Sequence, residues 1–431
     1  MKTKKIIFKR TFYVLCIMCF LLLVSTTIIL AIGGLNAGPI SSAAPISSVA
    51  PTTPVAPTTP VAPTTPAENS SAGSSEKPST PTLPQSVTIS AVGDIMLHQG
   101  NLNSAYDAKN KKYDFTGFFE YVKPYLSSSD LTIANFETVT AGAAIKYRSF
   151  PLFNSPDSIL PALSGAGVDV LSTANNHCLD WGTNGLIRTI QKIREYKMIN
   201  VGSSLNGKDK YVIKDVKGIK IAILSYSQFF NGHEVKLSSS DKSKYLSILN
   251  ETKIQSDIKE VKAKGADAVI TVLHWGNEYI RTPSTYQTNL SKKIFSWGAD
   301  IILGSHPHVV QKSEIVKANG KNKFIIYSMG NFISGYRRTD KAKRINKVFT
   351  EDGVIVTLKL EKDPKGGINL KDVSYIPTWV DMYSSKNKPV YKILPVPSPD
   401  VKAHYINSRN KPNVKQSYNN TMGLMAKFSG K

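Results

Sequence analysis

The larger part of this sequence predicts an α/β layered fold. Three features predict it: short β-rich runs recur along the chain, several of these runs are apolar almost throughout, and segments with helical spacing lie between them. Residues 87–385, roughly 300 in all, are enough to bury one large core or two packed layers. The expected strands are Val87–Val92, Leu131–Asn135, Val168–Ala174, Ile219–Tyr226, Ala268–His274, Ile301–Gly304, Phe324–Ser328 and Gly353–Leu360, and the expected helices are Thr183–Tyr196, Glu251–Lys264 and Thr285–Trp297.

The chain begins with a basic segment that is followed by a long uncharged one. Residues 1–10 carry five Lys and Arg side chains, and residues 11–33 are apolar or small throughout. At about 1.5 Å rise per residue this stretch can cross a hydrocarbon core of roughly 30 Å, whereas the apolar core of a cleaved signal peptide normally has about 7 to 15 residues. We therefore expect an uncleaved transmembrane signal anchor with its basic flank in the cytoplasm. The rest of this single-pass protein would then lie outside the cell membrane.

Residues 34–86 are dominated by Pro, Thr, Ser, Ala and Val, and Ala-Pro-Thr-Thr-Pro occurs at 56–60 and again at 62–66. Such a composition has too few large apolar side chains to offset the entropy of ordering the segment. We expect a disordered stalk of polyproline character, and a linker with no length requirement is an equally good interpretation. Cys178 has no partner for an internal disulfide in the exported part, so it is expected to be a packed thiol, with a reactive thiol as the alternative.

Polar motifs follow five of the expected strands. Because ligands of open α/β sheets bind outside the carboxyl ends of strands, these motifs are expected to meet in one crevice. Five of the seven histidines lie in such motifs, and neutral imidazole is the commonest metal ligand, so the pattern indicates a metal site. The motif residues of interest are Asp94, Glu137, Asn176 with His177, His274, and the pair His306 and His308.

Each motif taken alone also has a purely structural interpretation. Gly93-Asp94 is compatible with an ordinary turn, Asn175-Asn176 with a turn pair in left-handed backbone, and His274 with a core histidine. Asp180 is interpreted as structural, because Asp can accept hydrogen bonds from nearby amides. The two histidines that flank Pro307 are harder to explain in this way, since proline fixes its own φ and biases the preceding residue away from helix. We expect them on a rigid extended turn.

The charge balance is strongly basic. The sequence has 54 Lys and Arg against 31 Asp and Glu, a net charge of +23, which attracts polyanions. Residues 386–431 are expected to form a basic C-terminal tail. A second group, called the basic cluster below, comprises Arg337, Arg338, Lys341, Lys343, Arg344 and Lys347. It is either a solvated surface or a polyanion track in which Arg337, Arg338 and Arg344 contact the polymer. Nucleic acid is not expected as a partner of an exported domain without an aromatic-interleaved strand.

Six segments carry a family resemblance, in the order Gly93–Met96, Asn135–Glu137, Ala174–Gly182, His274–Tyr279, Gly304–Val309 and Tyr327–Phe332. They resemble the CapA family of poly-γ-glutamate capsule synthesis proteins over roughly residues 86–380. That family is similar to the calcineurin-like metallophosphoesterases. The resemblance implies a four-layer α/β/β/α sandwich with a two-metal site at strand ends.

The resemblance also implies a role for individual residues. Asp94 would bind the first metal, Glu137 would bridge both, Asn176 and His274 would bind the second, and His306 and His308 would serve one metal each. His177 would protonate the leaving group. Met96 stands where the superfamily has a histidine, and Glu137 stands where it has an aspartate. His98 comes two residues too late to be assigned that histidine's role.

Carboxylate, amide and imidazole ligands suit Mn, Fe or Zn, and two such ions would activate water for attack on a phosphoryl group. The resemblance implies a membrane-anchored extracytoplasmic accessory protein for synthesis or export of an anionic polymer such as poly-γ-glutamate, acting with membrane-bound synthetase or export subunits. Two alternatives stay open: a metal-dependent phosphoesterase acting on a small-molecule or cell-wall phosphoester, and a non-catalytic polyanion-binding module. Whether the chain is an enzyme therefore stays open. It has no Gly-rich phosphate loop ending in Lys-Ser/Thr, so it is not expected to be the ATP-driven polymerase.

Overall fold

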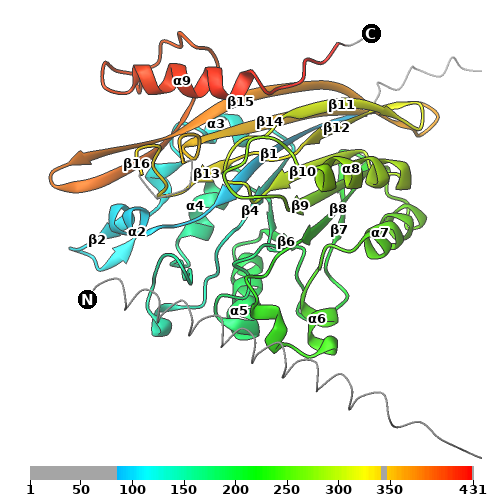
Figure 1. Cartoon of the computed structure of the whole chain (residues 1–431), viewed down its shortest axis with the longest axis horizontal. Coiled ribbons are helices and arrows are strands. Elements are labelled where there is room, and N and C mark those ends of the chain that lie inside the picture. Colours follow the sequence, from blue (N-terminus) through cyan, green and yellow to red (C-terminus); the bar gives the residue numbers. More distant parts are fainter. Residues whose placement is uncertain (1–84, 341–346, 430–431) are drawn as a thin grey trace, which may run out of the picture. The chain divides into compact units, whose positions relative to one another are not determined.

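The computed structural model of this chain describes residues 85–340 and 347–429 (Figure 1). The expected cytoplasmic segment 1–10, the anchor 11–33 and nearly all of the stalk 34–86 lie outside the described residues. Among the helices that are described, none combines the length and the apolar character that a membrane crossing requires.

Two β-sheets form the centre of the described part. The first has the strand order β16-β15-β14-β1-β4-β5-β6, with β13 paired to β1, and the second has the order β11-β12-β10-β9-β8-β7. The strands of the first sheet are β1 (Ser86–Ile95), β4 (Leu131–Asn135), β5 (Val170–Ser172), β6 (Ile199–Val201), β13 (Asn331–Ile333), β14 (Asp352–Lys362), β15 (Ile368–Ser385) and β16 (Lys388–Pro395). Those of the second are β7 (Val212–Val216), β8 (Ile219–Ser227), β9 (Ala268–His274), β10 (Ile301–Ser305), β11 (Ser313–Ala318) and β12 (Lys321–Ile326), and a small ribbon is formed by β2 (Tyr106–Asp107) and β3 (Lys112–Tyr113).

The helices lie mainly on the outer faces of the two sheets. The α-helices are α2 (Gln99–Ala105), α3 (Lys123–Leu126), α4 (Ile159–Ala166), α5 (Gly182–Glu195), α6 (Ser239–Tyr245), α7 (Glu251–Ala263), α8 (Thr285–Trp297) and α9 (Lys411–Met422). Short 3-10 turns occur at η1 (Thr116–Phe118), η2 (Ala143–Ile145) and η3 (His233–Lys236). Helices α7 and α8 cover the second sheet, α3 and α4 pack on the first, and α9 lies along β15 (Figure 1).

Central strands are buried on both faces, which explains their continuous apolar runs. In β8, Ile221 and Ile223 face the core between the sheets, whereas Ala222 and Leu224 pack against α7 and α8. Successive side chains of a strand point to opposite faces, and in β8 both faces meet an apolar layer. In space, the layers of the described part are therefore helices, the first sheet, the second sheet and again helices.

The expected strands and helices are all present, with bounds that differ by a few residues, and the mixed α/β class is confirmed. The ends of the expected helices agree closely with the structure because capping residues mark helix ends in the sequence. In α8, Ser284 and Gln287 form a capping box, and Gly298 ends the helix in left-handed backbone at φ +112°.

The end of the chain differs from the expected tail. The boundary expected between residues 385 and 386 falls inside the antiparallel β15–β16 hairpin. Farther on, Val414 of α9 packs with Trp379 and Leu394. Helix α9 buries only a narrow stripe and is otherwise polar. Its sequence therefore does not distinguish a helix packed on the sheet from a solvated segment.

The register of the strands brings the expected site together. Strands β1, β4 and β5 are parallel in the first sheet, with Asp94 opposite Asn135, and β9 and β10 are parallel in the second, with His274 opposite Ser305. Near the end of β1 the backbone lies in close contact with Gly330, the residue before β13. A Cβ built on Gly93 would lie 1.8 Å from the carbonyl oxygen of Gly330. Only glycine allows this approach, which aligns the ends of the two strands.

Candidate metal centre

The residues expected to bind metal form one buried cluster at the carboxyl ends of strands from both sheets. Asp94 ends β1, Glu137 follows β4, Asn176 follows β5, His274 ends β9, and His306 and His308 follow β10. None of these residues has more than 6% of its surface exposed. The convergence expected from the sequence is therefore present.

One half of the cluster comprises Asp94, Glu137 and His308. Oδ2 of Asp94 lies 3.1 Å from Nδ1 of His308, and Oε1 of Glu137 lies 3.6 Å from Nε2 of the same ring. Asn135 donates from Nδ2 to Oδ1 of Asp94 at 2.7 Å and so holds the carboxylate in place. Asn331 presents its Oδ1 to Nδ1 of His308 at 3.2 Å.

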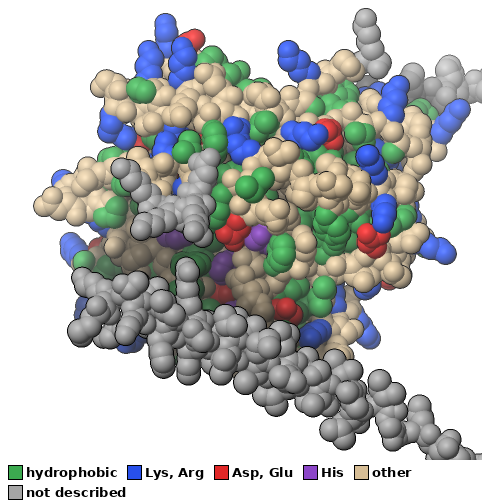
Figure 2. Space-filling model, in the orientation of Figure 1, with side chains coloured by type: hydrophobic (Ala, Val, Ile, Leu, Met, Phe, Trp, Pro, Cys, Tyr) green, Lys and Arg blue, Asp and Glu red, His purple; other side chains and the backbone are tan. Residues whose placement is uncertain are grey.

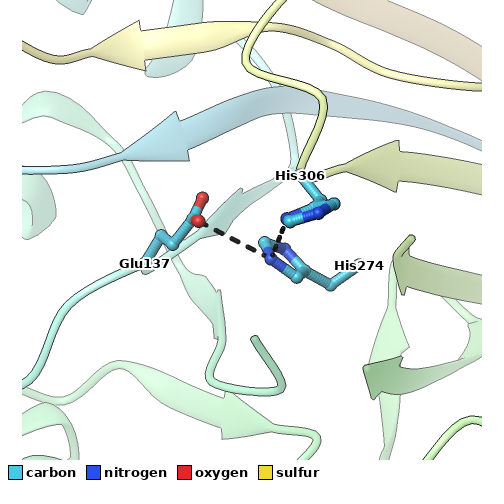
Figure 3. A group of neighbouring side chains, drawn as sticks. All are labelled: Glu137, His274 and His306. Atoms are coloured by element: carbon cyan, nitrogen blue, oxygen red, sulfur yellow. Dashed lines mark hydrogen bonds and ion pairs between the residues drawn. The ribbon is translucent and has the colours of Figure 1, made fainter. Parts of the chain in front are cut away.

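The other half comprises Glu137, His274 and His306 (Figure 3). Nε2 of His274 lies 3.6 Å from Oε1 of Glu137 and 3.1 Å from Nδ1 of His306. Oδ1 of Asn176 is 2.8 Å from the same Nε2. Glu137 therefore belongs to both halves through one oxygen, which is the arrangement expected of a bridging ligand.

The electrostatics of the cluster fit cations. Oε1 of Glu137 is buried and has no hydrogen-bond partner in the part of the chain that the structure describes. Burial, and then the Asp94 carboxylate, raise the pKa of Glu137 well above its usual value, while burial and the neighbouring His306 and His308 lower the pKa of His274 well below its usual value. Donor atoms separated by 2.8 to 3.6 Å have the spacing of neighbouring ligands that each lie about 2.0–2.2 Å from a common ion. Divalent cations would satisfy the orphaned oxygen and offset the charge that burial penalises.

The loop after β10 holds both histidines in left-handed backbone. The φ angles of His306 and His308 are +97° and +57°, which is uncommon for residues other than glycine. The expected extended turn is thus not what the structure shows. Strained backbone of this kind occurs at functional sites, where the surrounding fold enforces it. Here it directs one ring toward His274 and the other toward Asp94.

His177 follows the expected ligand Asn176 in the sequence and is held by a carboxylate. Its Nδ1 is 2.9 Å from Oδ2 of Asp180, which also accepts a hydrogen bond from the backbone N–H of Phe153 at 2.7 Å. The His177 ring meets Phe153 edge-on at 4.7 Å between centroids. Asp180 therefore accepts from a nearby amide, as expected, and in addition orients the expected proton donor, a function that the sequence did not suggest.

A pocket opens beside the second half of the cluster. It has a volume of about 410 Å³ and reaches His306. Its polar lining includes Gln228, Asn231, Glu234 and Glu278. Figure 2 shows histidine and acidic side chains together in a recess of this face. Of the expected ligands, only His306 lines this pocket.

Two arginines of the basic cluster form ion pairs within the protein, whereas a polyanion track would need free cationic side chains. Arg337 pairs with Glu351 at 2.8 Å, and Arg338 pairs with Glu351 at 2.8 Å and with Asp352 at 2.9 Å. Both guanidinium groups are thus engaged by buried carboxylates. Arg344, Lys341 and Lys343 lie outside the described residues, so the contact of Arg337, Arg338 and Arg344 with a polymer stays a prediction.

Several residues of the site were not assigned from the sequence. Asn135, Glu278 and Asn331 lie inside the motifs that were singled out, yet no part was given to them. Glu278 forms a third candidate group with His306 and His308. Met96, at the position where a histidine was expected in the superfamily, is a buried core residue. The signal that marked Asn135 was its place at the end of β4, two residues before Glu137, whereas Asn331 begins β13 and no assigned ligand stands beside it in the sequence.

Comparisons with known proteins give a consistent family. Residues 88–336 match the family described as "Bacterial capsule synthesis protein PGA_cap". The chain is 31% identical over 282 residues to the "Capsule biosynthesis protein CapA" of Bacillus anthracis, which covers 63% of this chain and 66% of that protein, just under two thirds of its length. It is 29% identical over 336 residues to the "PGA biosynthesis protein CapA" of Bacillus subtilis, which covers 74% of this chain and 78% of that protein.

Similar solved structures are more distant. The calcineurin-like phosphoesterase YfkN from Bacillus subtilis aligns with 79% of this chain and 99% of its own, at 16% identity and a TM-score of 0.41. The NAD nucleotidase NadN of Haemophilus influenzae aligns with 80% of this chain and 58% of its own, at 13% identity and a TM-score of 0.39.

Proposed function

The chain belongs to the PGA_cap family of bacterial capsule synthesis proteins, and on that basis we propose that it acts in the synthesis or export of an anionic capsule polymer, poly-γ-glutamate, through a buried two-metal centre. The names of both Bacillus relatives support the role in capsule synthesis. The observation that supports the metal centre best is Oε1 of Glu137, a buried oxygen without a hydrogen-bond partner that lies 3.6 Å from an imidazole nitrogen in each half of the cluster.

We further propose where the protein works. The uncharged segment 11–33 would anchor the chain in the cell membrane, and the Pro/Thr-rich residues 34–86 would connect the anchor to the extracytoplasmic domain. Membrane-bound synthetase or export subunits are the proposed partners, because the chain lacks a nucleotide-binding loop for polymerisation. Digestion of intact protoplasts by an added protease tests this orientation: the domain is degraded if it lies outside and protected if it lies in the cytoplasm.

The residues of the centre divide into two ligand sets that share Glu137. Asp94, Glu137 and His308 would hold one divalent ion, and Glu137, Asn176, His274 and His306 the other, with Mn, Fe or Zn suited to this mixture of donors. Such ions supply Lewis acidity toward an anionic oxygen and help to generate a nucleophile near neutral pH. Asn135 keeps the Asp94 carboxylate aligned, and Asp180 keeps the His177 ring aligned.

Gene replacement in the bacterium that carries this chain tests the proposal. Glu137→Gln and His308→Ala are expected to abolish stoichiometric transition metal in the purified full chain and to reduce surface polymer strongly. Glu120→Gln serves as the matched control, because Glu120 is an exposed carboxylate that pairs with Lys392 and belongs to none of the candidate metal groups. Normal polymer in metal-free variants would show that the centre is not needed, and normal polymer after deletion of the gene would exclude the capsule role itself.

The pair formed by His177 and Asp180 favours a second candidate function, the hydrolysis of a phosphoester. A carboxylate on one ring nitrogen leaves the other free to hand a proton to a leaving oxygen, and such positioned acids contribute about 10²–10⁴ in rate. Turnover of a chromogenic phosphodiester by the Mn-loaded chain tests this function. Asp180→Asn is expected to lower turnover by about tenfold or more while the metal content stays unchanged. Absence of turnover in the wild-type chain would contradict the function.

A further inference from the structure

His98 lies beside the metal centre without belonging to either ligand set. Its ring packs between Tyr336 and Phe153, at centroid distances of 4.5 and 5.3 Å. These two neighbours also contact site histidines: Tyr336 lies 5.6 Å from the ring of His308, and Phe153 lies 4.7 Å from that of His177. The His98 ring is therefore part of the wall that surrounds the Asp94 and His308 half of the centre.

One ring nitrogen of His98 is already used. The backbone N–H of Gly335 donates to Nδ1 at 3.1 Å, so this nitrogen acts as an acceptor and carries no proton. Burial, followed by the neighbouring His308 and Lys347, lowers the pKa of His98 to about 3, which keeps the ring neutral. A neutral imidazole whose Nδ1 accepts must carry its proton on Nε2.

The other ring nitrogen of His98, Nε2, is buried and lacks a partner in hydrogen-bond geometry among the described residues, although the backbone of Met96 also interacts with the ring and raises its pKa. Buried donors are rarely left unpaired, and an exception calls for a functional explanation. Gly335 supports the placement, because a Cβ on that residue would lie 2.4 Å from Cβ of His98, so the backbone can reach the ring only as glycine.

The neighbours of His98 are suited to an anion. Nζ of Lys347 lies 4.5 Å from the centre of the Tyr336 ring, and its nearest carboxylate, on Asp340, is 3.9 Å away. The Tyr336 hydroxyl accepts a hydrogen bond from Tyr279 at 3.1 Å and so keeps its own proton available. Hydrogen-bond donors and one cation thus lie around Tyr336, whose ring also contacts those of His98 and His308.

We propose that Nε2–H of His98, supported by Lys347, binds an anionic oxygen of the substrate next to the metal centre. The oxygen belongs to a phosphoryl group or to a carboxylate. This inference rests on the proposed function, because it requires that the metal centre receives an anionic substrate. His98 then binds the substrate and does not coordinate a metal ion.

Binding measurements on the metal-loaded full chain test this assignment with two probes, inorganic phosphate and a short γ-glutamate oligomer. His98→Phe keeps the ring volume and removes the donor, so we expect about tenfold weaker binding of whichever probe the site takes, with metal content unchanged. Lys347→Met is expected to weaken the same probe. The matched control is His404→Phe, since His404 packs between Tyr121 and Tyr405, outside the centre.

The possible outcomes separate the explanations. Unchanged affinity in His98→Phe overturns the assignment, and so does loss of metal in that variant, which would make His98 a ligand. Binding of neither probe by the wild-type chain overturns the proposed anionic substrate together with this inference, whereas the other two results leave the proposed function intact. If His98→Phe fails to fold, ¹⁵N NMR of histidine-labelled wild-type chain decides: a neutral Nε2–H ring at pH 5 is expected, and a protonated ring or an Nδ1–H tautomer overturns the assignment.

Discussion

Oδ2 of Asp94 lies 3.1 Å from Nδ1 of His308, and this contact joins residues 214 positions apart in the sequence. Asp94 ends a strand of the first sheet and His308 follows a strand of the second, so the contact links the carboxyl ends of both sheets. Burial lowers the pKa of His308, but the hydrogen bond and charge of Asp94 outweigh this effect and raise it above its usual value. The proposed metal centre is therefore also a junction between the two sheets, and we expect metal binding there to affect stability.

Metal binding is expected to stabilise the full chain against heat. A ligand that binds only the folded state adds about 2.7 kcal/mol at 100 times its Kd, so Mn should raise the Tm and EDTA should lower it. His308→Ala is expected to lose this response, as measured by differential scanning calorimetry with and without Mn. The control is His404→Phe, which should respond as the wild type does. An equal Mn response in His308→Ala would show that the stabilising ion binds elsewhere.

Arg338 is expected to act as a structural residue in addition to any contact with a polymer. Its guanidinium pairs with Glu351 and Asp352, and the three side chains are 11%, 2% and 2% exposed. Removing one partner of a buried ion pair leaves an uncompensated charge and costs about 3–5 kcal/mol, so Arg338→Met should lower the free energy of urea unfolding by that amount. Lys392→Met, which removes an exposed pair with Glu120, should cost about 0–1 kcal/mol. Similar losses in both variants would contradict the structural role.

The stability of the protein should depend on pH through His98. Its folded pKa of about 3 lies below the ordinary value of 6.5, so between these values the unfolded chain binds a proton that the folded chain does not. The unfolded state is then favoured as the pH falls, and the stability that the neutral ring contributes is fully present only above about pH 6.5. The slope amounts to about 1 kcal/mol per pH unit between pH 5 and 6. Urea unfolding at these two pH values should show a shallower dependence in His98→Phe, and identical slopes would argue against the low pKa.

Gly93 is expected to be indispensable at the end of β1. A Cβ at this position would lie 1.8 Å from the carbonyl oxygen of Gly330, so Gly93→Ala must separate the two backbones that align Asp94. We expect a loss of more than about 3 kcal/mol together with loss of metal. Gly165→Ala is the matched control, because Gly165 lies within α4 with no atom within 4 Å of the added Cβ. That change should stabilise the protein by about 0.5–1 kcal/mol. A Gly93→Ala protein as stable as the control would refute the close approach.

Cys178 is expected to be unreactive in the folded protein. The residue is 2% exposed, and burial raises the pKa of its thiol to about 12, so almost no thiolate exists at neutral pH. In a chain that carries Cys16→Ser and Cys19→Ser, titration with a thiol reagent should give no reaction until denaturant is added. Rapid labelling of the native chain would instead support the alternative of a reactive thiol.

The sequence alone determined the central strands and most of the candidate ligands. Apolar runs of strand length predicted the central strands, because those strands are buried on both faces and their sequences cannot be polar on either. The polar motifs that interrupt these runs marked Asp94, Glu137 and the histidines. Strand β16 was not expected although Ile393 and Leu394 are buried, and helix α9 was not expected because it is polar apart from a narrow buried stripe.

Only the tertiary structure decided which residues face one another. Asn331 lies 23 residues after His308 and Asp180 lies three residues after His177, and the structure shows that each contacts the ring in question. The sequence suggests that Arg338 is a surface charge, whereas in the structure it pairs with Glu351 and Asp352. The physical reason is that local patterns specify burial and strand ends, whereas pairing between side chains depends on tertiary packing, which brings Asp94 and His308 together from positions 214 residues apart. The unpaired Nε2 of His98 became visible only in that packing.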